Sequence, residues 1–150
     1  MKEQENIEYI AQELMNSFIK LNNSRRKKRS DRFGIKRSEF FLLNLLYHNV
    51  DKEQGMKVSD ISSALEITPA AVTHMINSLE DLGYVKRINH PTDRRVVLIS
   101  LTQKGFELTE KMHQEFYEDS KDLVNYLGTD KSFELIKLLK LSIKFYQEKK

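Results

Sequence analysis

The sequence contains no cysteine, few glycines and no long apolar run. Without cysteine, a disulfide scaffold, a thiolate zinc site, a thiol nucleophile and a thiol redox switch are all excluded. No window approaches the roughly 20 consecutive apolar residues of a membrane-spanning helix. The start, Met1-Lys2-Glu3-Gln4-Glu5, shows no signal peptide. The default expectation is a soluble cytoplasmic protein with no membrane partner.

Signals for catalysis and metal binding are also missing. The five glycines in 150 residues form no phosphate-binding loop, and nothing arranges Ser, His and Asp as a triad. His48, His90 and His113 are scattered without i, i+4 pairing. Glu110 lies three residues before His113, but a metal site there needs a second nearby histidine. The sequence predicts neither an enzyme nor a bound cofactor.

The totals bound the architecture. With 39% apolar and 31% charged residues, the chain has enough apolar material for a core and a heavily solvated exterior. Its length suggests one domain, or one small domain with helical extensions. The net charge of +3 and the pI near 9.0 suit a polyanionic partner only if the cations are suitably placed.

Both ends of the chain carry apolar residues at helical spacing. They are Ile7, Ile10, Leu14, Phe18 and Leu21, and then Ile136, Leu139, Ile143 and Tyr146. Left exposed, the two stripes would form an apolar patch of a kind that soluble monomers avoid, so we expect them to join two chains in a homodimer.

Five cations, Arg25–Arg29, follow the first stripe before a break at Ser30–Gly34. Two interpretations of these cations stay open, a contact with DNA phosphates or a solvated helix end.

Between the ends, a helix at Phe40–Tyr47 is followed by a polar loop and two short helices. Ser59 is expected to cap the first short helix, with Ile61, Ala64 and Leu65 pointing inward. Thr68 and Pro69 start the second, because Thr accepts a free backbone N–H and Pro at the first position has none to lose. The apolar stripe of this helix and its terminating glycine are Val72, Met75, Ile76, Leu79, Leu82 and Gly83.

After Gly83 the apolar period changes. Residues 84–88 and 96–100 are rich in strand-forming residues, and the turn-rich segment Asn89–Arg95 separates them, which predicts a hairpin with an extended tip. Thr102 then caps a long helix, and Gly128-Thr129-Asp130 separates it from a last one.

Two short helices followed by a hairpin form a helix-turn-helix unit, whose second helix lies in the major groove of DNA. The exposed side chains of that helix are small or hydrogen-bonding and include no carboxylate, which suits an approach to phosphates. They are Ala70, Ala71, Thr73, His74, Asn77 and Ser78. The alternative for this helix pair is an ordinary place in a core.

The hairpin is basic. Lys86, Arg87, Arg94 and Arg95 against Asp93 give it a net charge of +3, as much as the whole chain. Arginines at a turn tip suit a narrow minor groove, and Asp93 is suitably placed to hold one of them in a single rotamer. The alternative is a solvated charged turn.

These segments resemble the multiple antibiotic resistance regulator (MarR) family. The stretch Thr68–Arg87 is similar to its recognition helix, and Asp93-Arg94-Arg95 with Leu98–Gly105 is similar to its wing and the junction that follows. The resemblance is specific over Val58–Gly105, and the flanking helices match in order and length.

The resemblance implies a mainly α winged helix-turn-helix at about 36–101, with dimerisation helices at about 4–29 and 102–149 of a single domain, 1–150. It implies a dimeric repressor, occasionally an activator, of palindromic sites. Arg95 would enter the minor groove, Asp93 would position it, and Arg94 would contact phosphate. Together with Thr68, Lys86, Arg87 and the exposed helix residues above, these form the predicted DNA interface.

Three positions depart from the family pattern. His74 and Ser78 stand where arginine and a long basic residue are frequent, which affects the operator sequence. Glu66 stands in the turn between the short helices, where glycine is frequent, and suggests a turn that needs no positive φ.

The function predicted is an effector-released repressor of transcription that binds double-stranded DNA. With no cysteine and no clustered metal ligands, the effector is expected to be a small organic molecule, apolar with one polar or anionic group. Basic residues near Arg25–Lys36 and the aromatics of the Phe40 and Phe106 helices would suit this effector.

The alternatives to an effector-released repressor are an activator or architectural protein without an effector, or a protein–protein module. Such a module favours exposed aromatic anchors, which the Thr68 helix lacks.

Overall fold

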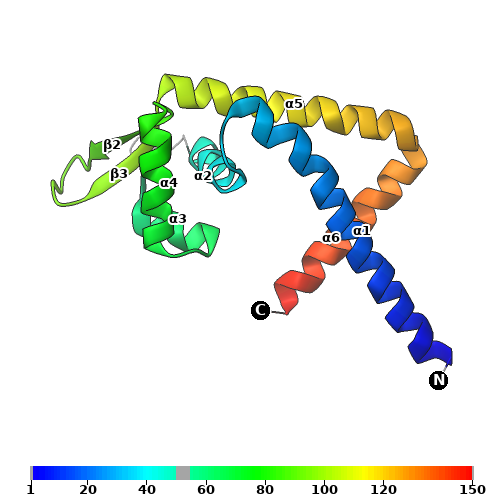
Figure 1. Cartoon of the computed structure of the whole chain (residues 1–150). Coiled ribbons are helices and arrows are strands. Elements are labelled where there is room, and N and C mark those ends of the chain that lie inside the picture. The colour runs from blue at the N-terminus through cyan, green and yellow to red at the C-terminus, as the bar shows by residue number, and fades with distance from the viewer. Residues whose placement is uncertain (1, 50–54, 150) are drawn as a thin grey trace.

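The computed structural model describes residues 2–49 and 55–149, without the side chains of residues 2–5 and 25–32. In chain order the elements are α1 (Lys2–Phe33), α2 (Arg37–His48), β1 (Met56–Lys57), α3 (Val58–Leu65), α4 (Pro69–Asp81), β2 (Val85–Asn89), β3 (Val97–Leu101), α5 (Gln103–Leu127) and α6 (Thr129–Glu148). Figure 1 shows α2, α3, α4 and the sheet gathered at one end, with α5 leading away and α6 folding back from its far end. This is the mainly α winged helix-turn-helix that the sequence predicts.

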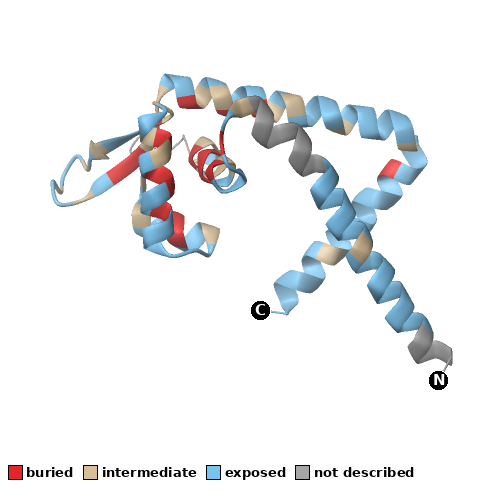
Figure 2. Ribbon diagram, viewed as in Figure 1, coloured by how far each residue is buried: buried red, intermediate tan, exposed pale blue. Residues whose placement is uncertain are grey.

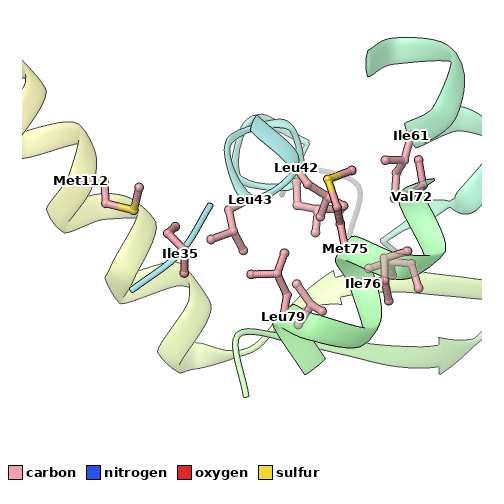
Figure 3. Close-up of a cluster of buried hydrophobic side chains, with 12 residues drawn as sticks. Ile35, Leu42, Leu43, Ile61, Val72, Met75, Ile76, Leu79 and Met112 are labelled. Atoms are coloured by element: carbon pink, nitrogen blue, oxygen red, sulfur yellow. The ribbon is translucent and has the colours of Figure 1, made fainter. Parts of the chain in front are cut away.

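The core lies where α2, α3 and α4 meet the sheet. Its fully buried side chains come from four elements around α4 and from α4 itself, and several are seen in Figure 3. They are Leu42, Leu43, Ile61, Val72, Ile76, Leu79, Val85 and Ile99. Figure 2 shows the contrast with α1 and α6, which are almost entirely exposed in the part of the chain described.

The recognition-helix candidate α4 begins and ends as predicted. Thr68 Oγ1 accepts the Ala71 N–H at 3.2 Å, and Pro69 occupies the first helical position. At the other end Gly83 has φ +77°, and the N–H groups of Gly83 and Tyr84 donate to the carbonyls of Glu80 and Leu79. This pair of bonds is a Schellman motif, which a glycine adopts without strain.

The hairpin is part of a three-stranded antiparallel sheet with strand order β1-β3-β2. Val85 pairs with Leu101 and Asn89 with Val97, which fixes the register of the hairpin. The two-residue β1, paired with β3 through Met56 and Ile99, was not predicted.

Three local expectations are wrong. The first concerns α1, which continues through Ser30 and ends at Phe33, where Gly34 takes φ +65°. The second concerns α3, which starts at Val58, so that its N-cap position is Lys57, two residues before the predicted Ser59. On that helix Ile61 is buried, as expected, but Ala64 is exposed.

The third concerns Glu66, which closes α3 in the left-handed conformation, at φ 55° and ψ 41°. The turn therefore requires the positive φ that we expected it to avoid. The Glu66 N–H donates to the Ser63 carbonyl, and the buried Ser62 hydroxyl donates to the Ile67 carbonyl at 2.6 Å. These bonds hold a non-glycine residue in a conformation that costs about 1–2 kcal/mol.

None of the described helices is both long and apolar enough to span a bilayer.

Candidate nucleic-acid interface

The outer face of α4 presents short polar side chains. Val72, Met75, Ile76 and Leu79 are buried on its inner face. On the outer face the predicted residues Thr68, Ala70, Ala71, Thr73, His74 and Asn77 are exposed, and Ser78 is half-buried. The structure therefore brings the predicted α4 residues together on one surface.

Thr73 has a restricted role on this face. Its hydroxyl donates to the Pro69 carbonyl at 2.9 Å, within the helix. With its proton used there, the Thr73 oxygen is left as an acceptor and its methyl group as an apolar contact.

The wing tip is organised by Asp93. Its Oδ1 accepts the backbone N–H of Arg95 at 3.0 Å and the Arg95 Nε–H at 3.4 Å. The Arg95 side chain is 92% exposed, so this ion pair is worth at most about 1 kcal/mol in water. The contact places the Arg95 Nε–H beside Asp93 and adds little to the stability of the fold. Lys86 and Arg94 are also exposed.

Arg87 does not behave as a free wing cation. Its guanidinium turns back to α4, where it forms an ion pair with Glu80 and donates to Asn77 Oδ1 at 2.7 Å. Sequence reasoning grouped Arg87 with the other hairpin cations because spacing alone does not show which strand face meets α4.

The sheet and α5 are joined tightly behind the interface. Thr102 donates from its hydroxyl to the Gly83 carbonyl at 2.7 Å and from its N–H to the Tyr84 carbonyl at 3.1 Å. The same hydroxyl accepts the Gly105 N–H at 3.0 Å, as a helix N-cap does. The Lys104 ammonium donates to the Leu82 carbonyl at 2.8 Å. The end of α4 and the start of α5 therefore share one hydrogen-bond network.

Two histidines that the sequence shows as scattered meet between α2 and α5. The rings of His48 and His113 stack at 5.4 Å, and His113 Nε2 is hydrogen-bonded to Asn44 Oδ1. Burial, and then the charge of His48, lower the pKa of His113. No third ligand completes a metal site among the residues described.

A cavity of about 320 Å³ lies between α2, β1, β3 and the start of α5. Its apolar lining includes Leu46, Met56, Ile99 and Phe106. The aromatic residues of the Phe40 and Phe106 helices were predicted to suit an effector. Of these two residues, Phe106 lines the cavity and Phe40 does not. The side chains of Arg25–Arg29 lie outside the described part of the chain.

Comparison with known proteins agrees with this geometry. The MarR family model matches residues 35–97. The HTH-type transcriptional regulator YkoM of Bacillus subtilis is 32% identical over 111 residues, covering 74% of this chain and 70% of that protein. The B. subtilis regulator YdgJ is 34% identical over 106 residues, 71% of this chain, and the match spans only 62% of its length.

Among solved structures, Streptococcus pneumoniae FabT in complex with DNA has a TM-score of 0.66 at 25% identity. The structural match covers 98% of this chain and 99% of the FabT chain. These relatives are transcription regulators rather than enzymes. With a polar helix face beside a basic wing, and with these relatives, the chain belongs to the MarR family and is a DNA-binding regulator of transcription.

Proposed function

We propose that the chain is a homodimeric, cytoplasmic repressor that binds a palindromic operator and is released by a small organic effector. In this proposal residues 36–101 bind DNA and the terminal helices join the two chains. One observation carries it: the polar face of α4 lies beside a wing whose tip carries an exposed arginine in contact with Asp93.

The DNA contacts follow from that observation. The N-terminal part of α4 enters the major groove, where His74 and Asn77 meet base edges. Arg95, held by Asp93, enters the adjacent minor groove, as arginines favour narrow A·T stretches. Lys86 and Arg94 contact phosphates, which gives affinity without sequence preference.

The dimer is supported by the apolar faces of the terminal helices. In the single chain Ile10, Leu14 and Phe18 of α1 and Ile136 and Leu139 of α6 are each about half exposed. Completing the burial of one such side chain contributes about 1 kcal/mol. Several such side chains on each helix, contributed by two chains, supply the burial free energy that a stable dimer needs.

An organic effector is supported by the absence of cysteine and by a cavity with both apolar and polar lining residues next to the α5 junction. The effector would act by binding better to a dimer whose recognition helices are wrongly spaced for DNA. Coupling of about 1–3 kcal/mol would weaken operator binding by roughly 5–150-fold.

The test begins by selecting bound fragments from genomic DNA and measuring affinity for the selected site. Arg95→Ala is expected to weaken specific binding by about 1–3 kcal/mol. Lys86→Ala is the matched control, expected to weaken all sequences alike and to reduce the salt slope by about one. An Arg95→Ala protein that is folded and dimeric, with unchanged affinity and specificity, contradicts the proposed interface.

Release is tested on the same complex. Phenolic and carboxylic metabolites, mild peroxide and zinc are titrated separately into it. Release by peroxide or zinc, with none by organic ligands, overturns the effector class. If none of these compounds releases the DNA, the result favours an activator or architectural protein without an effector.

A further inference from the structure

The Arg87 guanidinium bridges two side chains of the recognition helix. On α4, Asn77 and Glu80 are three residues apart, so they lie on the same side of the helix. Arg87, on β2, reaches both: it donates to Asn77 Oδ1 at 2.7 Å and pairs with the Glu80 carboxylate. The Arg87 and Glu80 side chains are only 38% and 36% exposed, so the pair is partly shielded from water.

The chemistry of this bridge fixes the orientation of the Asn77 amide. A guanidinium has donors and no acceptor. The Asn77 atom that faces Arg87 must therefore be its oxygen, which leaves the NH₂ group on the side of the amide turned away from Arg87. Glu80 holds the guanidinium in place, so the orientation exists before DNA arrives.

This orientation matters because asparagine can read DNA in more than one way. The usual pairing with adenine is bidentate and uses both the amide oxygen and the NH₂ group. In Asn77 the Arg87 guanidinium occupies one lone pair of the amide oxygen and stands beside it, which hinders the oxygen from accepting the adenine N6–H₂ group while the NH₂ donors stay available. Guanine shows two adjacent acceptors, N7 and O6, in the major groove.

We propose that Arg87 is a positioning residue for specificity, which makes Asn77 a donor-only reader that selects guanine over adenine. This inference rests on the proposed entry of α4 into the major groove. It adds to that proposal the base class that Asn77 recognises and the residue that sets it.

The experiment is selection from a randomised duplex DNA library with the full-length protein, followed by affinity measurements on the selected site and its single-base variants. The key variant is Arg87→Met, which keeps a long side chain and removes every donor. We expect the base preference at one position of each half-site to shift from guanine toward adenine by about fivefold or more. Arg87→Lys keeps a donor-only group and is expected to retain the guanine preference.

Two controls separate positioning from loss of charge or fold. Lys86→Met removes the neighbouring cation on the same strand, and is expected to lower affinity for all sequences without changing base preference. In an Asn77→Ala background, Arg87→Met is expected to have no effect on base preference, because the group it orients is gone. If Arg87→Met does not fold, judged by circular dichroism, Arg87→Gln replaces it; because glutamine can accept as well as donate, it is expected to shift the preference in the same direction.

The outcomes are distinct. If the wild-type protein selects no sequence, the proposed function fails. If it selects a site and Arg87→Met leaves the base preference unchanged, the positioning role is wrong and the proposed function stands. The positioning role is also wrong if the shift is equally large in the Asn77→Ala background.

Discussion

Gly105 provides a sharp test of the junction between the sheet and α5, because two physical effects predict opposite signs for Gly105→Ala. The residue lies in the first turn of α5, where alanine is a better helix former than glycine by about 1 kcal/mol. Propensity alone therefore predicts that the substitution stabilises the protein. The structure predicts the reverse, since a Cβ at this position would lie 1.9 Å from the Tyr84 carbonyl oxygen and 2.8 Å from its carbon.

The steric cost of the added methyl group is larger than the gain in helix propensity. Overpacking a tight site costs about 1–3 kcal/mol, and here the obstacle is backbone, which cannot rotate away. The Tyr84 carbonyl also accepts the Thr102 N–H, so displacing it weakens a hydrogen bond worth about 1 kcal/mol. After the gain in helix propensity is subtracted, we expect a net loss of about 1–3 kcal/mol.

The measurement is urea denaturation at one fixed protein concentration, since a dimer is stabilised by mass action. Gly105→Ala should lower the midpoint without changing the slope, and lower Tm by about 2–4 °C for each kcal/mol. Gln103→Ala, on the exposed side of the same turn, is the control and should change stability by less than about 0.5 kcal/mol. A Gly105→Ala protein as stable as the wild type, or more so, would refute the close approach of α5 to Tyr84.

Three further predictions concern the cap, the dimer and the histidine pair. Thr68→Ala should cost about 1 kcal/mol in urea denaturation through loss of the α4 cap, and an unchanged midpoint would contradict it. Ile136→Lys should leave the fold intact and give single chains in sedimentation at micromolar concentration, because Ile136 is 45% exposed in the single chain; a persistent dimer would exclude this face. The pKa of His113 is lowered on folding, so its contribution to stability is present above pH 6.5 and is lost as the pH falls through the folded value. Melting curves across this range should show a smaller loss for His113→Gln, and equal losses would assign the effect to other groups.

Sequence reasoning succeeded where the signal is local. Thr68-Pro69, Gly83 and Thr102 each mark a helix end through a bond within a few residues, and all three lie where predicted. The hairpin was also predicted, because its strands and turn have distinct compositions.

It failed where the determinant is a contact between distant residues. Strand β1 is two residues long, which is too short to show an alternating apolar pattern. It forms because its backbone pairs with the edge of β3. The start of α3 directly after Lys57 follows from that strand, and Glu66 is held at positive φ by bonds around the turn that composition does not reveal.

The candidate site shows the same division. The exposed face of α4 and the Asp93–Arg95 contact follow from helical period and from neighbouring residues, so both could be predicted. The Arg87 bridge spans ten residues to Asn77, and the His48–His113 stack joins two helices far apart in the chain. Nothing in residue spacing encodes these pairings.

The hydrogen bonds of Thr102 and Lys104 join the end of α4 to the start of α5, so a movement of α5 is transmitted to α4. With 25 residues at a rise of about 1.5 Å each, α5 is about 37 Å long. A tilt of about 5° at its far end, where α6 begins, moves its near end by about 3 Å. That displacement is close to the spacing of roughly 3.4 Å between stacked base pairs. A small angular change among the terminal helices would therefore shift the recognition helix by about one base step.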